Sequence, residues 1–420
     1  MKKFLPFGSV AMVMIPSHLL KLLLIILCCS NSLASQIEVE GNTKTSKEAI
    51  LRISRLNYLT KDKERIAKNN LLRSGLFIDA QVKKENKKTV IHVKEKWTTI
   101  PILKFNSGGG VGQTTLGVFD PNIAGEALEL GAQYTRLGKT NSGVLWHKFP
   151  YIKNSPFSFE VQLWKINRLR TKYNQNQDEP AELNGFLQTR DQFLLGLTNE
   201  VDAYNQIKLT TQYHNDVFSN DLVPLNVKNS LLPPRSHYQL ISLELKSDHF
   251  NYGPLERTGY SSLLRISHAI SLKSDQDNFQ ILEFEGFYNR RITQNLLWAN
   301  RLQIGGTNTD ILQYWFYRGG LQGIRGFLDN RFAGKYLMLL NSELRQNLYH
   351  HSKFILQGNF FADLINIKEK FDPELTGAST GLGLRLVLPQ FYRFVIRIDY
   401  AIPLIKDDDN ALSFGVQHFF

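Results

Sequence analysis

Residues Gly377–Gly381 spell Gly-Ala-Ser-Thr-Gly, the segment of this sequence that comes closest to an enzyme motif. The spacing matches a hydrolase nucleophile elbow, in which the serine lies on a sharp turn between a strand and a helix. Beyond Gly381, however, leucines alternate with other residues to Leu388, which predicts one continuous strand. We therefore expect no catalysis at Ser379.

Other side chains that could support catalysis or bind a metal are scattered. The ten histidines include one adjacent pair, His350–His351, but show no metal-ligand spacing, and no glycine-rich phosphate loop precedes a helix. Both cysteines, Cys28 and Cys29, lie near the N-terminus. The sequence thus predicts that the protein is not an enzyme and holds no cofactor and no metal.

Arg325 is the charged residue with the most informative surroundings, a glycine-rich connection of about residues 306–333. Connections this long are usually functional or disordered. If the loop folds back into the protein, the guanidinium needs an acidic partner, because an unpaired buried charge is costly. Glu343 and Asp363, on two neighbouring predicted strands, are the candidates. The open alternative is that all three are ordinary lumen charges bonded to water or to one another.

Both acids lie on the polar faces of predicted strands. Along residues 334–347 the polar side chains fall at odd positions, and along residues 353–364 Asp363 lies opposite an apolar face. Such alternation recurs about every 20 residues from Trp97 onward, without sustained helical periodicity. The predicted strands are 98–107, 113–121, 126–137, 142–150, 157–168, 185–198, 205–216, 237–248, 259–271, 278–290, 294–305, 334–347, 353–364, 377–388, 392–403 and 410–420.

These sixteen strands fit either a sandwich, whose apolar faces meet each other, or a membrane barrel, whose apolar face meets lipid. A membrane-spanning strand needs about 9 to 11 residues, which most of them supply. The mean hydropathy of −0.25 and the 42% hydrophobic content suit a barrel, and no run of about 20 apolar residues suits a membrane helix. We favour the barrel.

Residues 1–34 have the pattern of a secretory signal peptide. Lys2 and Lys3 precede an apolar stretch from Leu19 to Cys29, and Ser32-Leu33-Ala34 supplies small residues before a cleavage site. Cleavage after Ala34 would remove both cysteines and lower the formal charge from +12 to +9, because three lysines are lost. No compact Lys/Arg block predicts nucleic-acid binding.

Residues 35–97 predict a small α+β domain in the order strand, helix, helix, strand, strand. Ser46 could cap the first helix and Gly75 could end the second. Val39–Asn42 reads Val-Glu-Gly-Asn and Ser74–Phe77 reads Ser-Gly-Leu-Phe. With these motifs the segment resembles a POTRA domain, the periplasmic module of the BamA/TamA outer-membrane superfamily.

The long loop carries the strongest resemblance to that superfamily. Phe316–Phe327 is similar to the signature of its sixth extracellular loop, in which a Gly-Gly pair precedes Val/Ile-Arg-Gly-Phe. The matching residues are Gly319, Gly320, Ile324, Arg325, Gly326 and Phe327. Asp120–Gly125 resembles the turn after the family's second barrel strand, and Phe149–Tyr151 the end of its fourth. The resemblance covers essentially the whole mature chain.

The resemblance implies an all-β membrane protein, a 16-stranded antiparallel outer-membrane β-barrel over residues 98–420 preceded by one small α+β POTRA domain. In the family, acids matching Glu343 and Asp363 hold the loop arginine inside the barrel. The implied location is the bacterial outer membrane, with the POTRA domain in the periplasm. The implied partners are outer-membrane lipid, unfolded client outer-membrane proteins and assembly-complex lipoproteins, although a single POTRA departs from the five or three of the main bacterial insertases.

Two functions stay open. The first is insertion, assembly or translocation of other proteins without nucleotide hydrolysis. The alternative is a passive pore or bacterial surface antigen that retains the architecture without insertase activity.

The two terminal barrel strands complete the predicted site. The C-terminal segment resembles the targeting signal of outer-membrane barrels through Ser413, Gly415, His418 and Phe420, although His418 replaces the usual hydrophobic residue. In insertases of the family this strand meets the first one at a weak seam. The seam strand here comprises Ile102, Leu103, Lys104, Phe105 and Asn106. The glycines of Ser107–Gly110 could loosen the pairing, although we favour a flexible turn.

Overall fold

A computed structural model describes residues 37–56, 59, 61–85, 88–106, 112–150, 155–173, 182–223, 232–253, 256–320, 323–405 and 411–416. The predicted signal peptide lies outside the described residues, and so do both cysteines. No helix in the described ranges is both long and apolar enough to cross a membrane.

An α+β unit comes first in the chain. Its elements are β1 (Ile37–Glu40), α2 (Lys47–Ser54), α3 (Lys63–Ser74), β2 (Phe77–Glu85) and β3 (Lys88–Glu95), and the sheet order is β1-β3-β2. Ser46 caps α2 by accepting a bond from the Ala49 N–H, and Gly75 ends α3 in the left-handed conformation, with φ of 79°. The apolar helix faces pack on the sheet around Ile50, Leu71 and Ile91, all 0% exposed. This element order is the predicted one.

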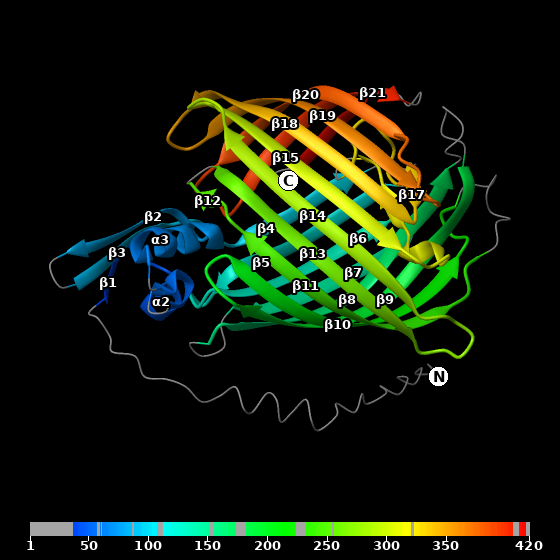
Figure 1. The fold of residues 1–420 in the computed structure, drawn as a ribbon, viewed down its shortest axis with the longest axis horizontal. Helices are drawn as coiled ribbons and strands as arrows, with labels where there is room; N and C mark the ends of the chain where they lie inside the picture. Colours follow the sequence, from blue (N-terminus) through cyan, green and yellow to red (C-terminus); the bar gives the residue numbers. More distant parts are fainter. Residues whose placement is uncertain are drawn as a thin grey trace, which may run out of the picture.

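The rest of the described chain is a closed antiparallel barrel. Its strands are β4 (Ile100–Asn106), β5 (Gln113–Ile123), β6 (Leu128–Leu137), β7 (Thr140–Phe149), β8 (Phe157–Tyr173), β9 (Glu182–Glu200), β10 (Asn205–Ser219), β11 (Ser236–Asp248), β12 (Asn251–Tyr252), β13 (Arg257–Ser271), β14 (Phe279–Arg291), β15 (Leu296–Thr307), β18 (Tyr336–His350), β19 (Ile355–Lys368), β20 (Gly377–Leu388), β21 (Phe394–Ile405) and β22 (Ala411–Val416). Each strand neighbours the next along the chain, and β22 closes the sheet on β4. The α+β unit lies at one end of this barrel (Figure 1).

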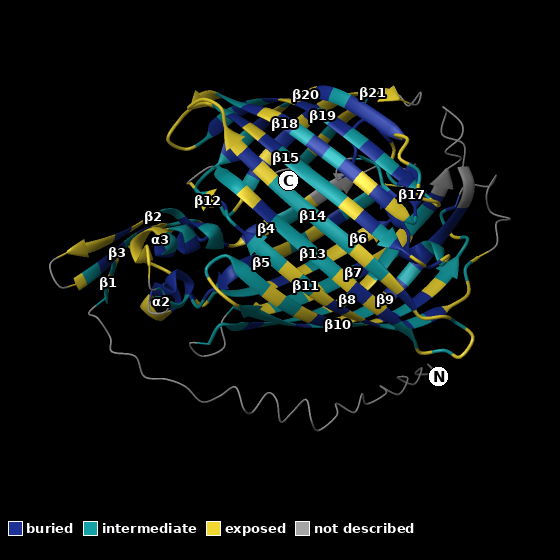
Figure 2. Ribbon diagram, viewed as in Figure 1, coloured by how far each residue is buried: buried dark blue, intermediate teal, exposed yellow. Residues whose placement is uncertain are grey.

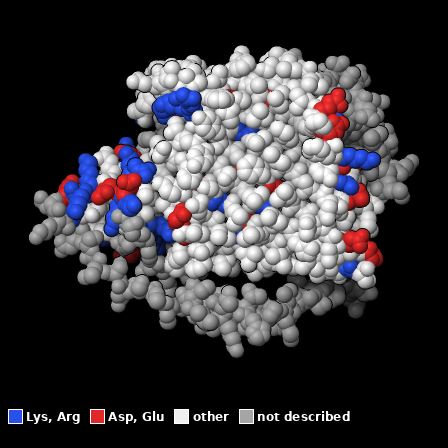
Figure 3. Space-filling model, in the orientation of Figure 1, with Lys and Arg blue, Asp and Glu red and all other residues white. Residues whose placement is uncertain are grey.

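Side chains alternate between the two faces of the barrel wall, as the period of two requires. On β19, buried positions such as Phe361 and Asp363 alternate with less buried ones such as the outward Phe360, which is 51% exposed. Figure 2 shows the resulting chequered wall. In Figure 3 the visible barrel surface carries few charged side chains, which gather toward its two ends. An apolar outer band with a polar interior is the surface of a membrane barrel.

The strand predictions differ from the structure in two details. Within the described residues the closed sheet contains seventeen strands, one more than predicted, because it includes the two-residue strand β12. Since β11 also pairs directly with β13, β12 does not span the wall. Asp120–Gly125 was predicted as a turn, but β5 continues to Ile123 through a register shift after Asp120. The turn follows, with positive φ at Ala124 and Gly125.

The connection between β15 and β18 folds into the barrel. It contains the 3-10 helix η2 (Leu312–Tyr314) and a small hairpin of β16 (Phe316–Arg318) and β17 (Phe332–Gly334). Its apolar side chains, among them Ile324 and Phe327, cluster with the inward-facing Leu339 and Ile365. The loop is therefore packed against the inner wall.

Candidate functional site

Arg325 lies at the centre of a buried clasp between the loop and the barrel wall. Its Nη1 donates to Glu343 Oε1 at 2.6 Å, and its Nη2 and Nε donate to Asp363 Oδ1 and Oδ2 at 2.7 and 2.8 Å. The backbone N–H of Arg325 donates to the same Asp363 carboxylate at 3.1 Å. The centroid of the Phe361 ring lies 3.5 Å from the guanidinium carbon of Arg325. All three charged side chains are 0% exposed, so the structure brings together the residues that the sequence paired.

The charged cluster around the clasp is larger than the sequence predicted. Glu343 also accepts from Arg345 and Arg385, at 2.7 and 2.6 Å. Asp399 on β21 lies 3.9 Å from Arg325 and 3.6 Å from Arg397. The sequence placed these residues on inward faces but gave no sign that they meet. Four guanidiniums lie beside three carboxylates, so every buried acid in the cluster has a cationic partner and the cluster carries one excess positive charge.

The glycines of the loop motif permit its tight course. Gly320 has φ of 63°, and a Cβ there would lie 1.8 Å from the Asp329 side chain. The Gly320 N–H donates to the Phe327 carbonyl at 2.9 Å, which closes the motif into a loop. Gly326, with φ of 89°, packs against Ala401 and Pro403 of β21. The side chains of Ile324 and Phe327 are 0% and 4% exposed, so each described motif residue either bends the loop or anchors it.

Inward-facing glycines of β20 make room for the clasp. A Cβ at Gly381 would lie 2.0 Å from the Tyr400 carbonyl and 2.5 Å from the Phe361 ring that supports Arg325. A Cβ at Gly383 would lie 2.2 Å from Asp399 Oδ1. Residues Gly377–Gly381 therefore form part of a strand that receives the loop, with no strand-to-helix turn at Ser379.

The loop has a second anchor that sequence reasoning missed. Tyr314 packs edge-on against Tyr238 and close to Phe279, with ring centroids 5.5 and 4.6 Å away, and its hydroxyl lies 3.2 Å from His214 Nδ1. The Arg190 guanidinium lies over the Tyr314 ring and pairs with Asp216. These partners belong to β9, β10, β11 and β14, and only β15 separates β14 from β18. The loop is thus held by the wall over a wide stretch, from β9 to β19.

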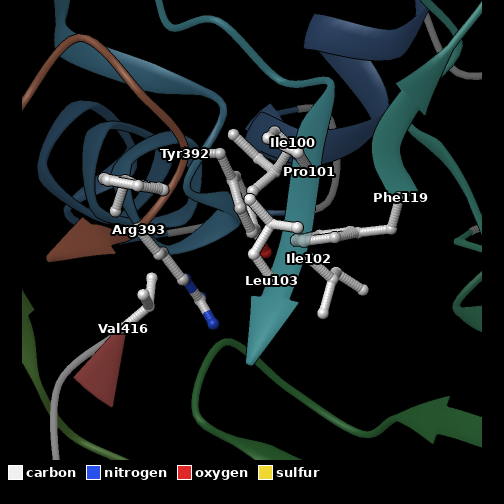
Figure 4. Close-up of a pocket in the computed structure, with 9 residues that line it drawn as sticks. Ile100, Pro101, Ile102, Leu103, Phe119, Tyr392, Arg393 and Val416 are labelled. Atoms are coloured by element: carbon white, nitrogen blue, oxygen red, sulfur yellow. The ribbon is translucent and has the colours of Figure 1, made fainter. Parts of the chain in front are cut away.

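The seam between β22 and β4 differs from the clasp, because mostly apolar side chains lie there. The described pairing of β21 with β22 runs from Ala401 opposite Ala411 to Ile396 opposite Val416. Beside Val416 lies a cavity of about 130 Å³ whose lining includes Ile100–Leu103, Phe394 and Val416 (Figure 4). Because successive residues of a strand point to opposite faces, a cavity lined by four consecutive residues lies at the strand edge. An apolar cavity therefore lies along the edge of β4 at the seam of the closed barrel.

Pro101 lies in the same part of β4. It lacks an N–H, and a proline in a sheet is tolerated where its nitrogen faces an unpaired edge. The backbone of the predicted seam strand pairs with β5, from Ile102 opposite Gly117 to Asn106 opposite Gln113. The side chains of Lys104, Phe105 and Asn106 lie outside the described part of the structure.

The predicted C-terminal signal is only partly described. Ser413 and Gly415 lie in β22 opposite Asp399 and Arg397. His418 and Phe420 lie outside the described residues.

The α+β unit contacts barrel turns that extend from β5, next to the seam strand β4, to the β11–β13 turn. Lys44 Nζ pairs with Asp120 at 2.8 Å, and Arg55 Nη1 pairs with Glu200 at 2.7 Å. On α3, Asn69 donates to the Phe250 carbonyl and accepts from the Tyr252 N–H. The contacts join β5, β9 and the β11–β13 turn to one face of the unit, so it is fixed across the end of the barrel.

Glu95 holds the segment that carries Lys44. Its carboxylate accepts from the Thr43 hydroxyl at 2.6 Å and from the Lys44 and Thr45 N–H groups at 2.8 and 2.7 Å. Partial burial works to raise the pKa of Glu95, but these hydrogen bonds outweigh it and lower the pKa below its usual value.

Together, the fold and the site define a transmembrane β-barrel with a loop clasped in its lumen and an apolar cavity at its seam. Residues 122–420 match the model of the Omp85 superfamily domain. The chain therefore belongs to the Omp85 superfamily, whose members are outer-membrane barrels. This confirms the predicted superfamily and fold class.

Solved structures give the same fold. A structure of BamA from Haemophilus ducreyi lacking POTRA domains 1-3 superposes with a TM-score of 0.56 at 15% identity, over 90% of this chain and 83% of that one. CdiB from Escherichia coli superposes with a TM-score of 0.61 at 14% identity, over 90% and 74%. CdiB from Acinetobacter baumannii gives 0.56 at 11%, over 91% and 73%. Among curated proteins none matches.

Proposed function

We propose that this protein assists the insertion, assembly or translocation of other proteins at the bacterial outer membrane, through the seam between β22 and β4 and without nucleotide hydrolysis. The observation that carries the proposal is the apolar cavity at the seam, which is lined by Val416 of β22 and by the part of β4 where Pro101 offers no N–H to a neighbouring strand. A strand entering a membrane with unpaired backbone groups pays several kcal/mol for each. Pairing with an available strand edge removes much of that barrier.

The α+β unit has a place in this scheme as a POTRA-like periplasmic domain, residues 35–97, with residues 1–34 as its export signal. Among the described residues β1 and β2 are the edge strands of its sheet, where an extended client segment could add as a further strand. Contacts from Lys44 and Arg55 hold it beside the barrel mouth. Unfolded client outer-membrane proteins are the proposed substrates, and assembly-complex lipoproteins are possible partners in the same pathway.

The clasped loop supports this function over that of an open pore. Arg325 binds β18 and β19, whereas Asn330 donates to the Leu169 carbonyl of β8 and the Arg170 guanidinium of β8 lies over the Tyr317 ring. Because β8 is distant from β18 in the closed sheet, these contacts indicate that the loop crosses the lumen and obstructs it. We expect low conductance in planar bilayers. A large, steady conductance would favour the passive pore.

A cross-link across the seam tests the proposal. Cys28 and Cys29 are the only natural cysteines and belong to the predicted signal peptide, so engineered pairs can be labelled selectively. The test pair is Leu103→Cys with Val416→Cys, joined by a short bismaleimide. The matched control is Leu103→Cys with Leu116→Cys, which stand opposite each other on the β4–β5 ladder.

We expect the seam cross-link to reduce the outer-membrane levels of other barrels in cells that depend on this protein, and the control cross-link to leave them unchanged. Equal levels with both pairs would contradict a role for the seam and favour the passive barrel.

A further inference from the structure

Three arginines of β8 and β9 share one part of the inner wall. Arg168 stands opposite Gln188 in the β8–β9 register, and Gln188 is 1% exposed and donates to Asp216, so this face of the two strands is the inner one. Arg170 and Arg190 lie on the same face, because each is two residues from one member of that pair. The three guanidiniums lie close enough to repel one another.

These arginines lie toward the barrel end opposite the α+β unit. β8 starts beside that unit, because its first residue pairs with Asn199, next to the Glu200 that binds Arg55. Arg168 is the twelfth residue of β8, whereas about 9 to 11 residues cross a bilayer. Lys165 indicates the same boundary, since it is an exposed cation on the outer face, where charge is unfavourable within the hydrocarbon. The arginines therefore line a mouth of the lumen that the outer solution can reach.

The described acids in this part of the lumen do not balance the three arginines. Asp216 is 0% exposed and accepts from Arg190 at 2.7 and 2.8 Å and from Gln188 at 2.8 Å, so its carboxylate is fully engaged. Arg170 donates to Gln188 at 3.4 Å and has no described carboxylate partner. Arg168 forms no hydrogen bond or ion pair with any described residue and is exposed to the lumen. The group therefore carries two positive charges in excess.

The long loop holds two of the three guanidiniums in place. Arg170 Cζ lies 4.5 Å from the centroid of the Tyr317 ring, and Arg190 Cζ lies 5.0 Å from that of the Tyr314 ring. A guanidinium that stacks on a ring keeps its N–H donors at its edges, where they can bind an acceptor. Arg168 and Arg170 are two residues apart on one face, about 7 Å along the strand, which one small anion can bridge. The arrangement is that of an oxyanion site.

We propose that this group binds phosphate, free or as a monoester, from the outer solution, with Arg168 and Arg170 as its ligands and Arg190 adding positive charge. A phosphate monoester carries about 1.5 to 2 negative charges at pH 7, which matches the excess of two, and arginine binds phosphate oxygens bidentately. Phosphorylated lipid headgroups have the same chemistry, but they lie outside the wall and the arginines lie inside it. The site goes beyond the proposed function, because neither the seam nor a client takes part in it.

Isothermal titration calorimetry tests the site, with the full-length protein in zwitterionic detergent and inorganic phosphate as the probe. A hydrogen bond to a charged group contributes about tenfold or more in affinity. We therefore expect about tenfold weaker binding in Arg168→Gln and about 100-fold weaker binding in Arg168→Gln/Arg170→Gln. The matched control is Arg265→Gln, an inner-face arginine that Glu244 and Glu283 already neutralise, and it should bind phosphate like wild type. No saturable binding to wild type, or an equal loss in the control, would overturn the proposal.

Thermal unfolding separates phosphate binding from a structural role of Arg168. Its replacement removes repulsion and no described hydrogen bond, so without phosphate we expect Arg168→Gln to unfold at the wild-type temperature or above it. A ligand that binds only the folded state stabilises it, so phosphate should raise the unfolding temperature of wild type and have less effect on the variant. An equal rise in both proteins, or a lower unfolding temperature of the variant without phosphate, would count against the site.

Competition distinguishes the two sources of phosphate. Glycerol 3-phosphate carries a phosphate monoester without acyl chains, and dioctanoyl phosphatidic acid carries the same group on a lipid. Because the arginines lie on the inner side of the wall, we expect glycerol 3-phosphate to displace inorganic phosphate and the lipid to bind no more tightly. Displacement by the lipid alone would overturn the assignment to a soluble ligand.

Discussion

The clasp and the seam are two arcs of the same sheet with opposite designs. On the clasp side, β18 and β19 are 15 and 14 residues long and surround buried ions. On the seam side, the described residues of β4 and β22 border an apolar cavity. Buried charges have few acceptable partners, whereas apolar surface accepts any apolar partner. The clasp is therefore suited to hold one arrangement, and the seam to exchange its contacts.

The largest expected effect comes from breaking the clasp. Glu343→Ala leaves Arg325, Arg345 and Arg385 around an empty position, and removing one partner of a buried ion pair typically costs about 3–5 kcal/mol. We expect that loss in the free energy of unfolding, measured by urea denaturation in lipid vesicles.

The matched control for that measurement is Glu283→Ala. Glu283 pairs with Arg265, and both side chains are 35% exposed, so we expect a loss of at most about 1 kcal/mol. Equal losses in the two variants would mean that the clasp is no more rigid than an ordinary lumen ion pair.

A somewhat smaller effect should follow from crowding the wall behind the clasp. Gly381→Ala places a methyl group against the Tyr400 carbonyl and the Phe361 ring, and overpacking of this kind costs about 1–3 kcal/mol. Gly143→Ala is the control, since a Cβ there meets nothing within 4 Å. The same urea measurement applies, and a Gly381→Ala protein as stable as Gly143→Ala would contradict the packing argument.

At the seam we expect a smaller change of opposite sign. Pro101→Val restores a backbone N–H, and one added hydrogen bond contributes about 0.5–1.5 kcal/mol. The variant should show slower amide exchange in β4 and, under the proposed function, slower client assembly. Leu116→Val on β5 adds no donor and serves as the control. Unchanged exchange in Pro101→Val would mean that the proline does not limit seam pairing.

The smallest effect concerns the contacts that hold the α+β unit beside the seam. The pKa of Glu95 is lower in the folded protein than in the unfolded chain, where it is about 4.3. The stabilisation by the Glu95 carboxylate is therefore complete above about pH 4.3 and is lost as the pH falls through the pKa of the folded state. We expect protection of the Lys44 and Thr45 amides to decrease below about pH 4. Glu95→Gln should abolish this pH dependence, whereas Glu64→Gln on α3 should keep it.

Much of the architecture was predictable because it follows from local patterns. Period-two alternation located the barrel strands within a few residues, and Ser46 and Gly75 marked helix ends by their capping preferences. The same alternation placed Glu343 and Asp363 on the inner face of adjacent strands, which is why their meeting with Arg325 could be predicted. The prediction needed one further assumption, that the loop enters the lumen.

The rest of the cluster was not predictable from alternation. That pattern says that Arg385 and Asp399 point inward, but their height in the barrel depends on the stagger between strands, which is a property of the closed sheet. The Tyr314 anchor has the same origin, because His214 is 100 residues away in the chain. The one local feature that pointed to the Tyr314 anchor was the presence of an aromatic residue in a long loop.

By itself the sequence determined which residues form strands, which face each side chain takes, and which loop carries a charge that must be paired, because these depend on the backbone period and on the cost of burying an ion. Only the tertiary structure decided that seven charged groups share one cluster, that the loop reaches from β18 and β19 across to β8, and that an apolar cavity lies at the seam. Those features depend on where separate strands come to rest in the closed barrel, and short-range pattern carries no information about that position.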